Sequence, residues 1–149
     1  MKLGLGTAQF GLDYGVSNRG GKTPPAEVAA ILRAAAAQGI DVLDTAPLYG
    51  DSEASLGQAL AGSDRFRIVT KTPAFDQRPI STADVKHLRD TFRQSLQKLG
   101  VANVYGLLIH HADDLLAVNG ESLFEAAAAL KREVLVQKIG TSVYTGEEI

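Results

Sequence analysis

Short apolar runs with the character of β-strands alternate with longer helix-like segments along this 149-residue chain. The apolar runs lie at residues 2–8, 40–44, 67–71, 104–109 and 137–143. Such alternation is the sequence signature of βαβ units, in which helices join parallel strands. The sequence therefore predicts an α/β fold of the (β/α) TIM-barrel type, with about five βα units in one domain spanning residues 1–149.

The segments between the strands carry start and stop signals for helices. Thr23 is expected to cap a first helix that has Pro25 in its first turn and ends at Gly39. Ser52 is expected to begin a second helix, with Glu53 near its N-terminal dipole.

Two further helices are expected later in the chain. The third should begin with a capping box of Ser81 and Asp84 and end at Gly100, because apolar residues between them recur at three- and four-residue steps. An Ala-rich fourth helix is expected at 121–132, and residues 146–149 resemble the first turn of another helix.

The chain is short for a closed barrel. An eight-stranded (β/α) barrel typically needs about 250 residues, whereas this chain has 149. Five strands of eight would leave an exposed sheet edge and uncovered apolar faces, which natural proteins avoid by closure, covering or association. We therefore expect a truncated barrel, or a homodimer formed through the exposed sheet edge.

Composition and charge exclude several classes of partner. The net charge is −2 and the sequence pI is near 5.9, so nothing indicates binding to nucleic acid or an anionic membrane. The chain has no cysteine, which fits a reducing compartment. No stretch approaches the roughly 20 apolar residues of a membrane span. We expect a cytoplasmic protein that acts on small molecules.

Four residues with proton-transfer chemistry follow the predicted strands closely. They are an acid, a phenol, an amine and an imidazole: Asp44, Tyr49, Lys71 and His110. Parallel α/β barrels keep their catalytic groups at the carboxyl ends of strands. A free tyrosine is a slow acid at neutral pH, and a nearby ammonium favours its ionised form. The four residues form a proton-transfer set, and the set predicts an oxidoreductase.

The motifs around these residues resemble those of the aldo-keto reductase family. They are Leu3–Gly11, Asp44–Gly50 with Ser52-Glu53 and Leu56-Gly57, Val69–Lys71, Leu107–His110 and Lys138–Ser142. The resemblance covers the front half of such an enzyme. It implies a (β/α) barrel, a small-molecule carbonyl substrate and NADP(H) as cofactor, with NAD(H) as the open alternative.

The resemblance also assigns roles. It makes Tyr49 the general acid, with Lys71 and Asp44 tuning it and His110 orienting the carbonyl oxygen. For the cofactor it implicates Asp44 again, together with Gly6 and Thr7 near the nicotinamide and Ser142 on the carboxamide. The family often has asparagine after that serine, where this chain has Val143. Phe10 and Tyr14 are candidates for a wall of the substrate pocket.

Other interpretations compete with this one. Tyr49 and Asp44 could be ordinary turn residues, Lys71 an exposed strand-end lysine, and His110 a core histidine. The chain could also be an inactive half-barrel that associates with itself or with a separate C-terminal half. A Rossmann site is disfavoured, because Gln9 stands where the third glycine of G-x-G-x-x-G should be.

A metal-dependent hydrolase is the least favoured alternative. His110, His111, Asp113 and Asp114 offer metal-ligating groups in one short segment. Neighbouring residues of a strand point to opposite faces, so the two histidines should not bind one ion unless the strand has ended. The two aspartates are expected in a loop or at a helix start, and we expect no metal site. His87 is expected at the surface.

Overall fold

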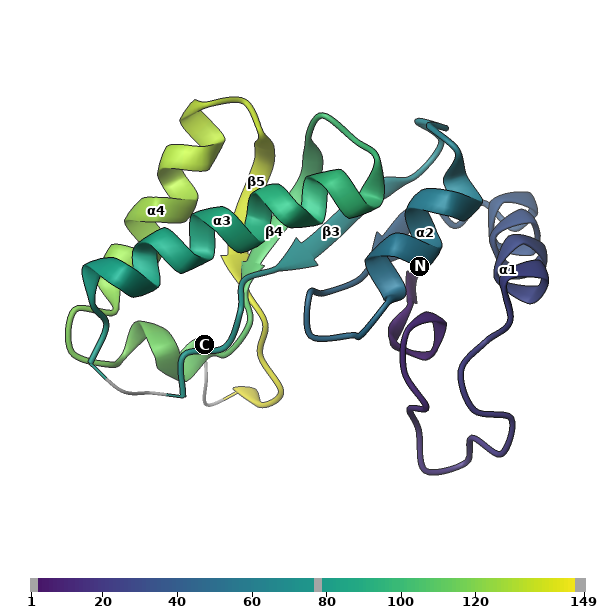
Figure 1. The fold of residues 1–149 in the computed structure, drawn as a ribbon, viewed down its shortest axis with the longest axis horizontal. Coiled ribbons are helices and arrows are strands. Elements are labelled where there is room, and N and C mark those ends of the chain that lie inside the picture. Colours follow the sequence, from purple (N-terminus) through teal and green to yellow (C-terminus); the bar gives the residue numbers. More distant parts are fainter. Residues whose placement is uncertain (1–2, 77–78, 147–149) are drawn as a thin grey trace.

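The computed structural model, which describes residues 3–76 and 79–146, contains one parallel five-stranded sheet (Figure 1). The strands lie side by side in chain order: β1 (Gly4–Gly6), β2 (Val42–Asp44), β3 (Arg67–Lys71), β4 (Val104–Ile109) and β5 (Val136–Thr141). Helices connect them: α1 (Pro25–Ala37), α2 (Ser52–Leu60), α3 (Thr82–Leu99) and α4 (Glu121–Arg132). The predicted alternation of parallel strands and helices is confirmed.

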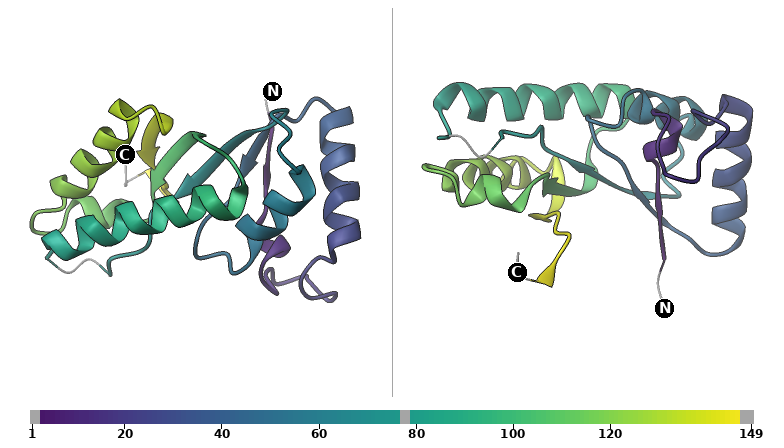
Figure 2. Two further views of the ribbon diagram at one scale, coloured as in Figure 1. Left: turned by 45° about the horizontal axis from the view of Figure 1, so that its top comes forward. Right: turned by 90° about the horizontal axis from the view of Figure 1, so that it is seen from below.

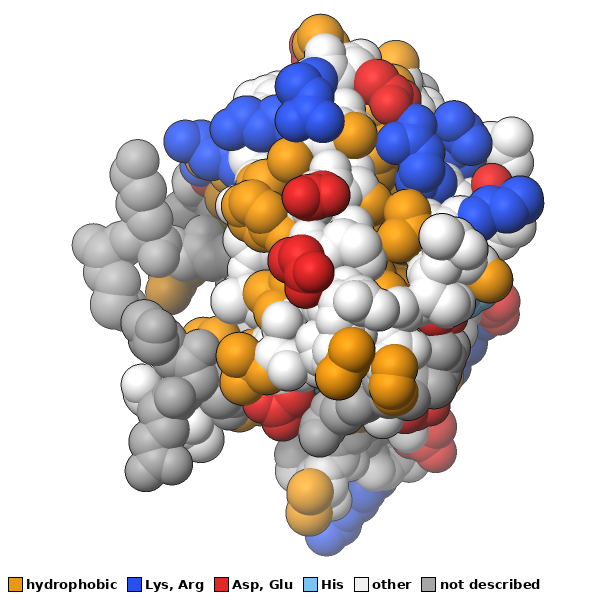
Figure 3. Space-filling view, turned by 90° about the vertical axis from the view of Figure 1, so that its left-hand side faces the viewer, with side chains coloured by type: hydrophobic (Ala, Val, Ile, Leu, Met, Phe, Trp, Pro, Cys, Tyr) orange, Lys and Arg blue, Asp and Glu red, His pale blue; other side chains and the backbone are white. Residues whose placement is uncertain are grey.

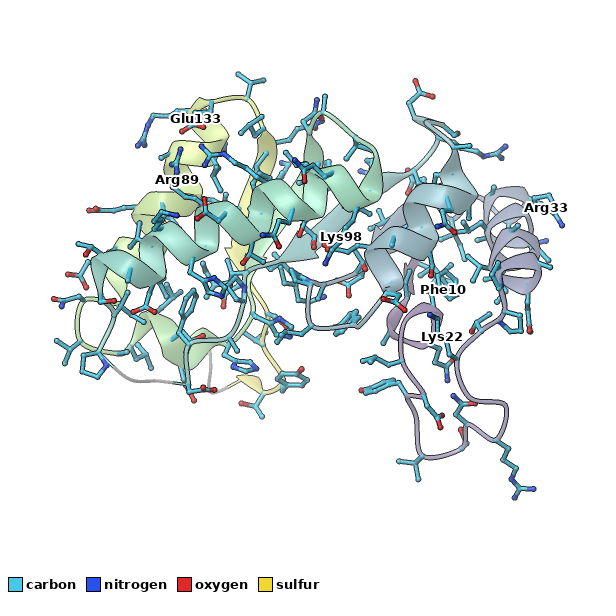
Figure 4. The ribbon with its side chains drawn as sticks, in the orientation of Figure 1. Phe10, Lys22, Arg33, Arg89, Lys98 and Glu133 are labelled. Carbon is cyan, nitrogen blue, oxygen red and sulfur yellow. The ribbon has the colours of Figure 1, made fainter. Side chains whose placement is uncertain are left out.

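The helices all lie on one side of the sheet. Each packs against the next in chain order, so together they form an arc around the strands (Figure 2). Arg89 of α3 donates to Glu133 just after α4 over 2.6 Å, which fastens these two helices together (Figure 4). The core lies between the helices and the sheet, and the buried strand residues Leu43, Ile68 and Leu107 are among its members.

The other face of the sheet is more open. Cβ atoms added to Gly106 and Gly140 would meet Val69 and Leu108, so these four residues share a face, and Val69 and Leu108 are only half-buried. Strand alternation places Lys71 on this same face. No helix within residues 3–76 and 79–146 covers it (Figure 2).

The strongest helix signals of the sequence were correct. Ser81 Oγ accepts from the Asp84 amide, and the Asp84 carboxylate accepts from the Ser81 amide, so the capping box is present. Gly100 ends α3 in the left-handed conformation at φ 68°. The cap expected from Thr23 was wrong, because Pro24 is the N-cap of α1 and no side chain bonds the helix end.

Several strand boundaries were also wrong. β1 ends at Gly6 instead of residue 8, because the chain turns into a short 3₁₀ helix, η1 (Ala8–Phe10), which buries Phe10 against α2 (Figure 4). β2 begins two residues late at Val42, and β5 spans Val136–Thr141 rather than 137–143. Residues 147–149 of the expected final helical turn lie outside the described residues, as do residues 1–2.

No helix in the described part of the chain is long and apolar enough to cross a membrane. The cytoplasmic location stays a prediction.

Candidate active site

The structure brings the four proton-transfer residues to one edge of the sheet, at the carboxyl ends of neighbouring strands. Asp44 and Lys71 are the last residues of β2 and β3, and His110 directly follows β4. Tyr49 lies in the connection between β2 and α2. In a parallel sheet these strand ends converge, which is why residues up to 66 positions apart in the sequence lie together here.

Lys71 and Asp44 form a partly buried ion pair. Lys71 Nζ donates to Asp44 Oδ1 over 2.6 Å and to the Thr45 carbonyl oxygen over 3.0 Å. The lysine side chain is 5% exposed and that of the aspartate 39%. Two acceptors therefore fix the direction of a charged group that has little contact with water, and the carboxylate keeps an exposed side.

Tyr49 lies next to this ammonium. Lys71 Nζ is 4.8 Å from the centre of the Tyr49 ring. The backbone that carries the ring forms two successive turns. The Tyr49 amide donates to the Ala46 carbonyl oxygen over 3.1 Å, and the Ser52 amide donates to the Tyr49 carbonyl oxygen over 3.0 Å. The phenol thus lies on a short, hydrogen-bonded segment at the mouth of the sheet.

His110 completes the group. Its ring meets the Tyr49 ring edge to face, with 6.1 Å between the centroids. Burial lowers the pKa of His110, and the neighbouring His111 and Lys71 lower it further. Nδ1 lies 3.3 Å from the Thr72 carbonyl oxygen. If the neutral ring donates from Nδ1 to the Thr72 carbonyl oxygen, its Nε2 can only accept. Nε2 donates in two other forms: the imidazolium, and the neutral tautomer with its proton on Nε2, which loses the 3.3 Å bond to Thr72.

The residues expected to contact a cofactor differ in what they can offer. Gly6 ends β1, and a Cβ placed there would meet no atom within 4 Å, so the space beside its backbone is open. The Thr7 side chain is buried, and its hydroxyl donates to the Asp44 carbonyl oxygen over 2.9 Å. Ser142 directly follows β5 and is half-buried, while Val143 is exposed.

A pocket of about 350 Å³ opens beside Tyr49 and Asp44. Its remaining lining comes from the end of β1 and the loop that follows: Gly6, Thr7, Ala8, Gln9, Tyr14 and Gly15. Tyr14 lines this pocket as expected. Phe10 does not, because it is only 3% exposed and packs in the core. Gln9 was not foreseen as a lining residue, since its loop position carries no sequence signal.

The segment considered for a metal site has a different arrangement from the one expected. β4 ends at Ile109, so strand alternation does not separate His110 from His111, and their rings lie 5.0 Å apart in an edge contact. The two aspartates lie in the 3₁₀ helix η2 (Ala112–Leu115), which confirms their expected place at a helix start. Among the described residues, no group of three or more His, Cys, Asp or Glu side chains could hold a metal ion. His87 is exposed, as expected.

The sequence did not indicate that Ser52 and Thr45 belong to the site, nor that their hydroxyl groups meet that of Thr7 in the interior. Ser52 was expected only to start a helix, yet its Oγ lies within 3.1 Å of the hydroxyl oxygens of both Thr7 and Thr45. Thr7 and Thr45 each stand one residue beyond a strand, as His110 does, and this shared position could have drawn attention to them. The role of Ser52 depends on a turn that the sequence does not reveal.

The profile of the Aldo/keto reductase family matches residues 2–149. The chain belongs to the aldo/keto reductase family. It is 36% identical over 137 residues to a 6-dehydroglucose reductase of Agrobacterium fabrum, covering 80% of this chain and 44% of that protein. It is 33% identical over 144 residues to a 6-dehydroglucose reductase of Novosphingobium aromaticivorans, covering 87% and 45%. The resemblance inferred from the motifs is confirmed.

Solved structures agree with this assignment. A putative aldo-keto reductase from Pseudomonas aeruginosa superposes with a TM-score of 0.79 and 33% identity, covering 97% of this chain and 56% of that one. An aldo/keto reductase from Klebsiella pneumoniae, solved with NADP and acetate, gives a TM-score of 0.70 and 25% identity, covering 97% and 46%. The barrel-type fold is confirmed, and the chain spans about half the length of the relatives it matches.

Proposed function

We propose that the chain carries the catalytic group of an NADP(H)-dependent reductase that converts aldehydes or ketones to alcohols. The observation that carries this proposal is the contact of Lys71 Nζ with Asp44 and Thr45 on one side and with the Tyr49 ring on the other. A cation held by two acceptors beside a phenol is the arrangement that a tyrosine acid requires. Membership of the family supports the same reaction class.

Each residue then has a distinct part in proton transfer. Tyr49 donates its phenolic proton to the oxygen of the bound carbonyl, and Lys71 stabilises the phenolate that remains. Asp44 holds the ammonium in place. His110 binds the carbonyl oxygen through Nε2 in a protonation form that donates, and its edge contact with the Tyr49 ring keeps the two groups on one oxygen.

The residues at the strand ends fit a nicotinamide cofactor. The open space beside Gly6 allows a flat ring to approach the backbone closely, and Ser142 offers a hydroxyl at the same edge of the sheet. When bound, the reduced cofactor supplies the hydride. The Klebsiella structure with NADP supports NADP(H) over NAD(H).

We further propose a hydroxylated aldehyde as the substrate class. Two relatives are named 6-dehydroglucose reductases. The residues that line the pocket beside Tyr49 include Gly6, Gly15 and Gln9. The Gln9 amide nitrogen donates to the Tyr14 carbonyl oxygen over 2.8 Å, and its amide oxygen remains an acceptor. Such groups can hydrogen-bond sugar hydroxyls. Turnover of 6-dehydroglucose should exceed that of benzaldehyde at equal concentration; the reverse order would contradict this substrate class.

Two measurements test the reductase proposal. NADPH should bind saturably to the purified chain, which cofactor fluorescence can follow because the sequence has no tryptophan. Tyr49→Phe should abolish carbonyl reduction while leaving NADPH binding nearly intact, because it removes only the proton donor. Tyr105→Phe, at the far end of the sheet, is the matched control. Retained reduction in Tyr49→Phe would reject the assignment of the acid.

A second candidate is a catalytically inactive half-barrel that associates with another copy of itself. The open sheet face with half-buried Val69 and Leu108 favours it, as do the exposed side chains of Leu116, Val118 and Phe124. Hydrophobic side chains also reach the surface between charged ones on the side where α4 lies (Figure 3). Light scattering after size exclusion should then give twice the mass of 15.7 kDa; a monomer at all concentrations would reject association.

A further inference from the structure

We propose that Ser52 is a positioning residue that holds Tyr49 beside Lys71. The inference rests on the proposed function, since it concerns the geometry of the proton donor. Ser52 is the first residue of α2 and follows Tyr49 by three positions. Its side chain is fully buried and is not among the residues that line the pocket beside Tyr49, so it does not act on substrate directly.

The Ser52 hydroxyl is the centre of a small buried cluster. Ser52 Oγ donates to the Thr7 carbonyl oxygen over 2.8 Å. It also lies 2.9 Å from Thr7 Oγ1 and 3.1 Å from Thr45 Oγ1. All three side chains have no exposed surface. Ser52 is the one member that contacts both of the others, so it joins the end of β1 to the end of β2.

The hydrogens of this cluster can be assigned. Because a carbonyl oxygen only accepts, the single hydroxyl hydrogen of Ser52 goes to the Thr7 carbonyl oxygen. Ser52 Oγ then accepts from Thr45, and Thr7 donates to the Asp44 carbonyl oxygen over 2.9 Å. No hydroxyl hydrogen then points along the 2.9 Å approach of Thr7 Oγ1 to Ser52 Oγ, so this approach is a packing contact. Removal of the Ser52 hydroxyl would take away the buried acceptor of the Thr45 hydroxyl. Buried polar groups are rarely left without a hydrogen-bond partner, because this is costly in free energy.

Thr45 connects the cluster to the ammonium. Its carbonyl oxygen accepts from Lys71 Nζ over 3.0 Å, while its hydroxyl contacts Ser52. On the other side, the Ser52 amide donates to the Tyr49 carbonyl oxygen over 3.0 Å. One continuous set of hydrogen bonds therefore runs from Lys71 through Thr45 and Ser52 to Tyr49. The contact between the Thr45 and Ser52 hydroxyls therefore links the residue that binds the Lys71 ammonium to the residue that binds the Tyr49 backbone.

Close backbone packing limits how this segment can move. A Cβ at Gly11 would lie 1.8 Å from the Tyr49 carbonyl oxygen and 2.2 Å from the Ser52 nitrogen. Gly50 has φ +56°, and a Cβ there would lie 2.5 Å from the Gly11 carbonyl oxygen. The turn that carries Tyr49 is thus pressed against the loop after β1, and the Ser52 hydroxyl fixes its remaining end.

The test follows the position of Tyr49 without requiring catalysis. The chain has four tyrosines, so labelling with 3-fluorotyrosine gives up to four fluorine resonances, and Tyr49→Phe identifies that of Tyr49. Ser52→Ala should shift or broaden the Tyr49 resonance while that of Tyr105 stays in place. The control is Ser95→Ala, which removes an equally buried hydroxyl that donates within α3 to the Thr91 carbonyl oxygen. An unmoved Tyr49 resonance in Ser52→Ala would overturn the inference.

A second variant covers the case in which Ser52→Ala does not fold. Thr45→Val deletes the hydroxyl that contacts Ser52 but keeps the backbone carbonyl that binds Lys71, and it should move the Tyr49 resonance in the same direction. Thr45→Ser, which retains the hydroxyl, should restore it. An unmoved resonance in Thr45→Val would again overturn the inference.

Kinetics separate this inference from the proposed function. In the active protein, Ser52→Ala should lower kcat by about 10²-fold, the size of effect that misplacement of a catalytic group produces. The KM of Ser52→Ala for NADPH should stay unchanged. Reduction retained by Tyr49→Phe would reject the proposed function. Reduction lost in Tyr49→Phe, with kcat and the Tyr49 resonance unchanged in Ser52→Ala, would reject only the positioning role.

Discussion

Two groups of the same chemical make-up lie at opposite ends of strands β2 and β3. Each contains a cation of β3, a carboxylate at β2 and a tyrosine ring, and in each the cation lies 4.8 Å from the ring centre. The carboxyl-end group consists of Lys71, Asp44 and Tyr49, and the amino-end group of Arg67, Asp41 and Tyr105. The contact that carries the proposed function therefore has a close chemical counterpart in the same molecule.

The two groups differ in burial and in the type of cation. Arg67 Nη2 donates to both oxygens of Asp41 over 2.8 Å, but these side chains are 38% and 55% exposed. The hydrogen bond that Arg67 donates to Asp41 raises the pKa of Arg67 above its usual range, so the guanidinium stays charged. Lys71 is nearly buried, and its neighbours Asp44 and Tyr49 line the pocket of about 350 Å³. Arg67 and Tyr105 line a separate pocket of about 390 Å³ at the amino end, so a nearby pocket does not separate the two groups. Burial and neighbouring side chains, rather than residue types alone, distinguish a candidate catalytic group from an exposed ion pair.

The two groups should differ most in how the loss of their cation changes the rate of carbonyl reduction. Lys71→Met should lower the rate of carbonyl reduction by about 10²-fold or more, because the acid loses the charge that favours its ionised form. Arg67→Met should leave the rate nearly unchanged. Both rates follow from NADPH oxidation under saturating substrate. Equal losses in the two variants would mean that the cation acts on the fold and not on proton transfer.

The next largest difference should be in the free energy of unfolding after loss of Asp44 or of Asp41. Asp44→Asn leaves the Lys71 ammonium buried without its charged partner. This substitution should lower the free energy of unfolding by about 2 kcal/mol. The loss is smaller than for a fully buried pair because the Asp44 side chain is partly exposed. Asp41→Asn should cost distinctly less, since its pair is exposed. Urea denaturation of both variants provides the comparison, and a larger loss in Asp41→Asn would contradict it.

Mild acidification should lower the free energy of unfolding through His110 at the carboxyl end. Burial holds the folded-state pKa of His110 below the unfolded value of about 6.5. Below pH 6.5 the unfolded chain therefore binds a proton that the folded chain resists, so this contribution to the free energy of unfolding is complete above 6.5 and declines as the pH falls through that value. His110→Gln should flatten this decline in urea titrations, whereas His87→Gln, at an exposed site, serves as the control.

Salt should have the smallest effect and act mainly at the amino end. Exposed ion pairs are screened at high ionic strength, while partly buried pairs are screened less. In 1 M sodium chloride, which corresponds to a Debye length of about 3 Å, the stability difference between the wild type and Asp41→Asn should shrink. The difference for Asp44→Asn should persist. Loss of both differences would indicate that the two pairs are equally exposed to solvent.

The elements with strong local signals were predicted well from the sequence. The span of α3 followed from its apolar period, its capping box and Gly100, all of which act over a few residues. Strand lengths were predicted less well. β1 was expected to reach residue 8, but burial of Phe10 against α2 ended it at Gly6, and that contact joins segments more than 40 residues apart.

The candidate site shows the same division. The order of Asp44, Tyr49, Lys71 and His110 after successive strands was enough to propose them together. The direction of the Lys71 ammonium, the buried contacts of Ser52 and the 1.8 Å approach at Gly11 came only from the structure. Nothing in the sequence pattern indicated the pair of Arg67 and Asp41 either.

The sequence by itself determined the alternation of strands and helices, the parallel sheet and the residue types delivered to its carboxyl end, because periodicity and turn chemistry are local properties. The tertiary structure decided which of those side chains touch and which of two similar ion pairs has a nearly buried cation. These outcomes depend on strand register and on packing between distant segments, and such contacts form only when the whole sheet is assembled.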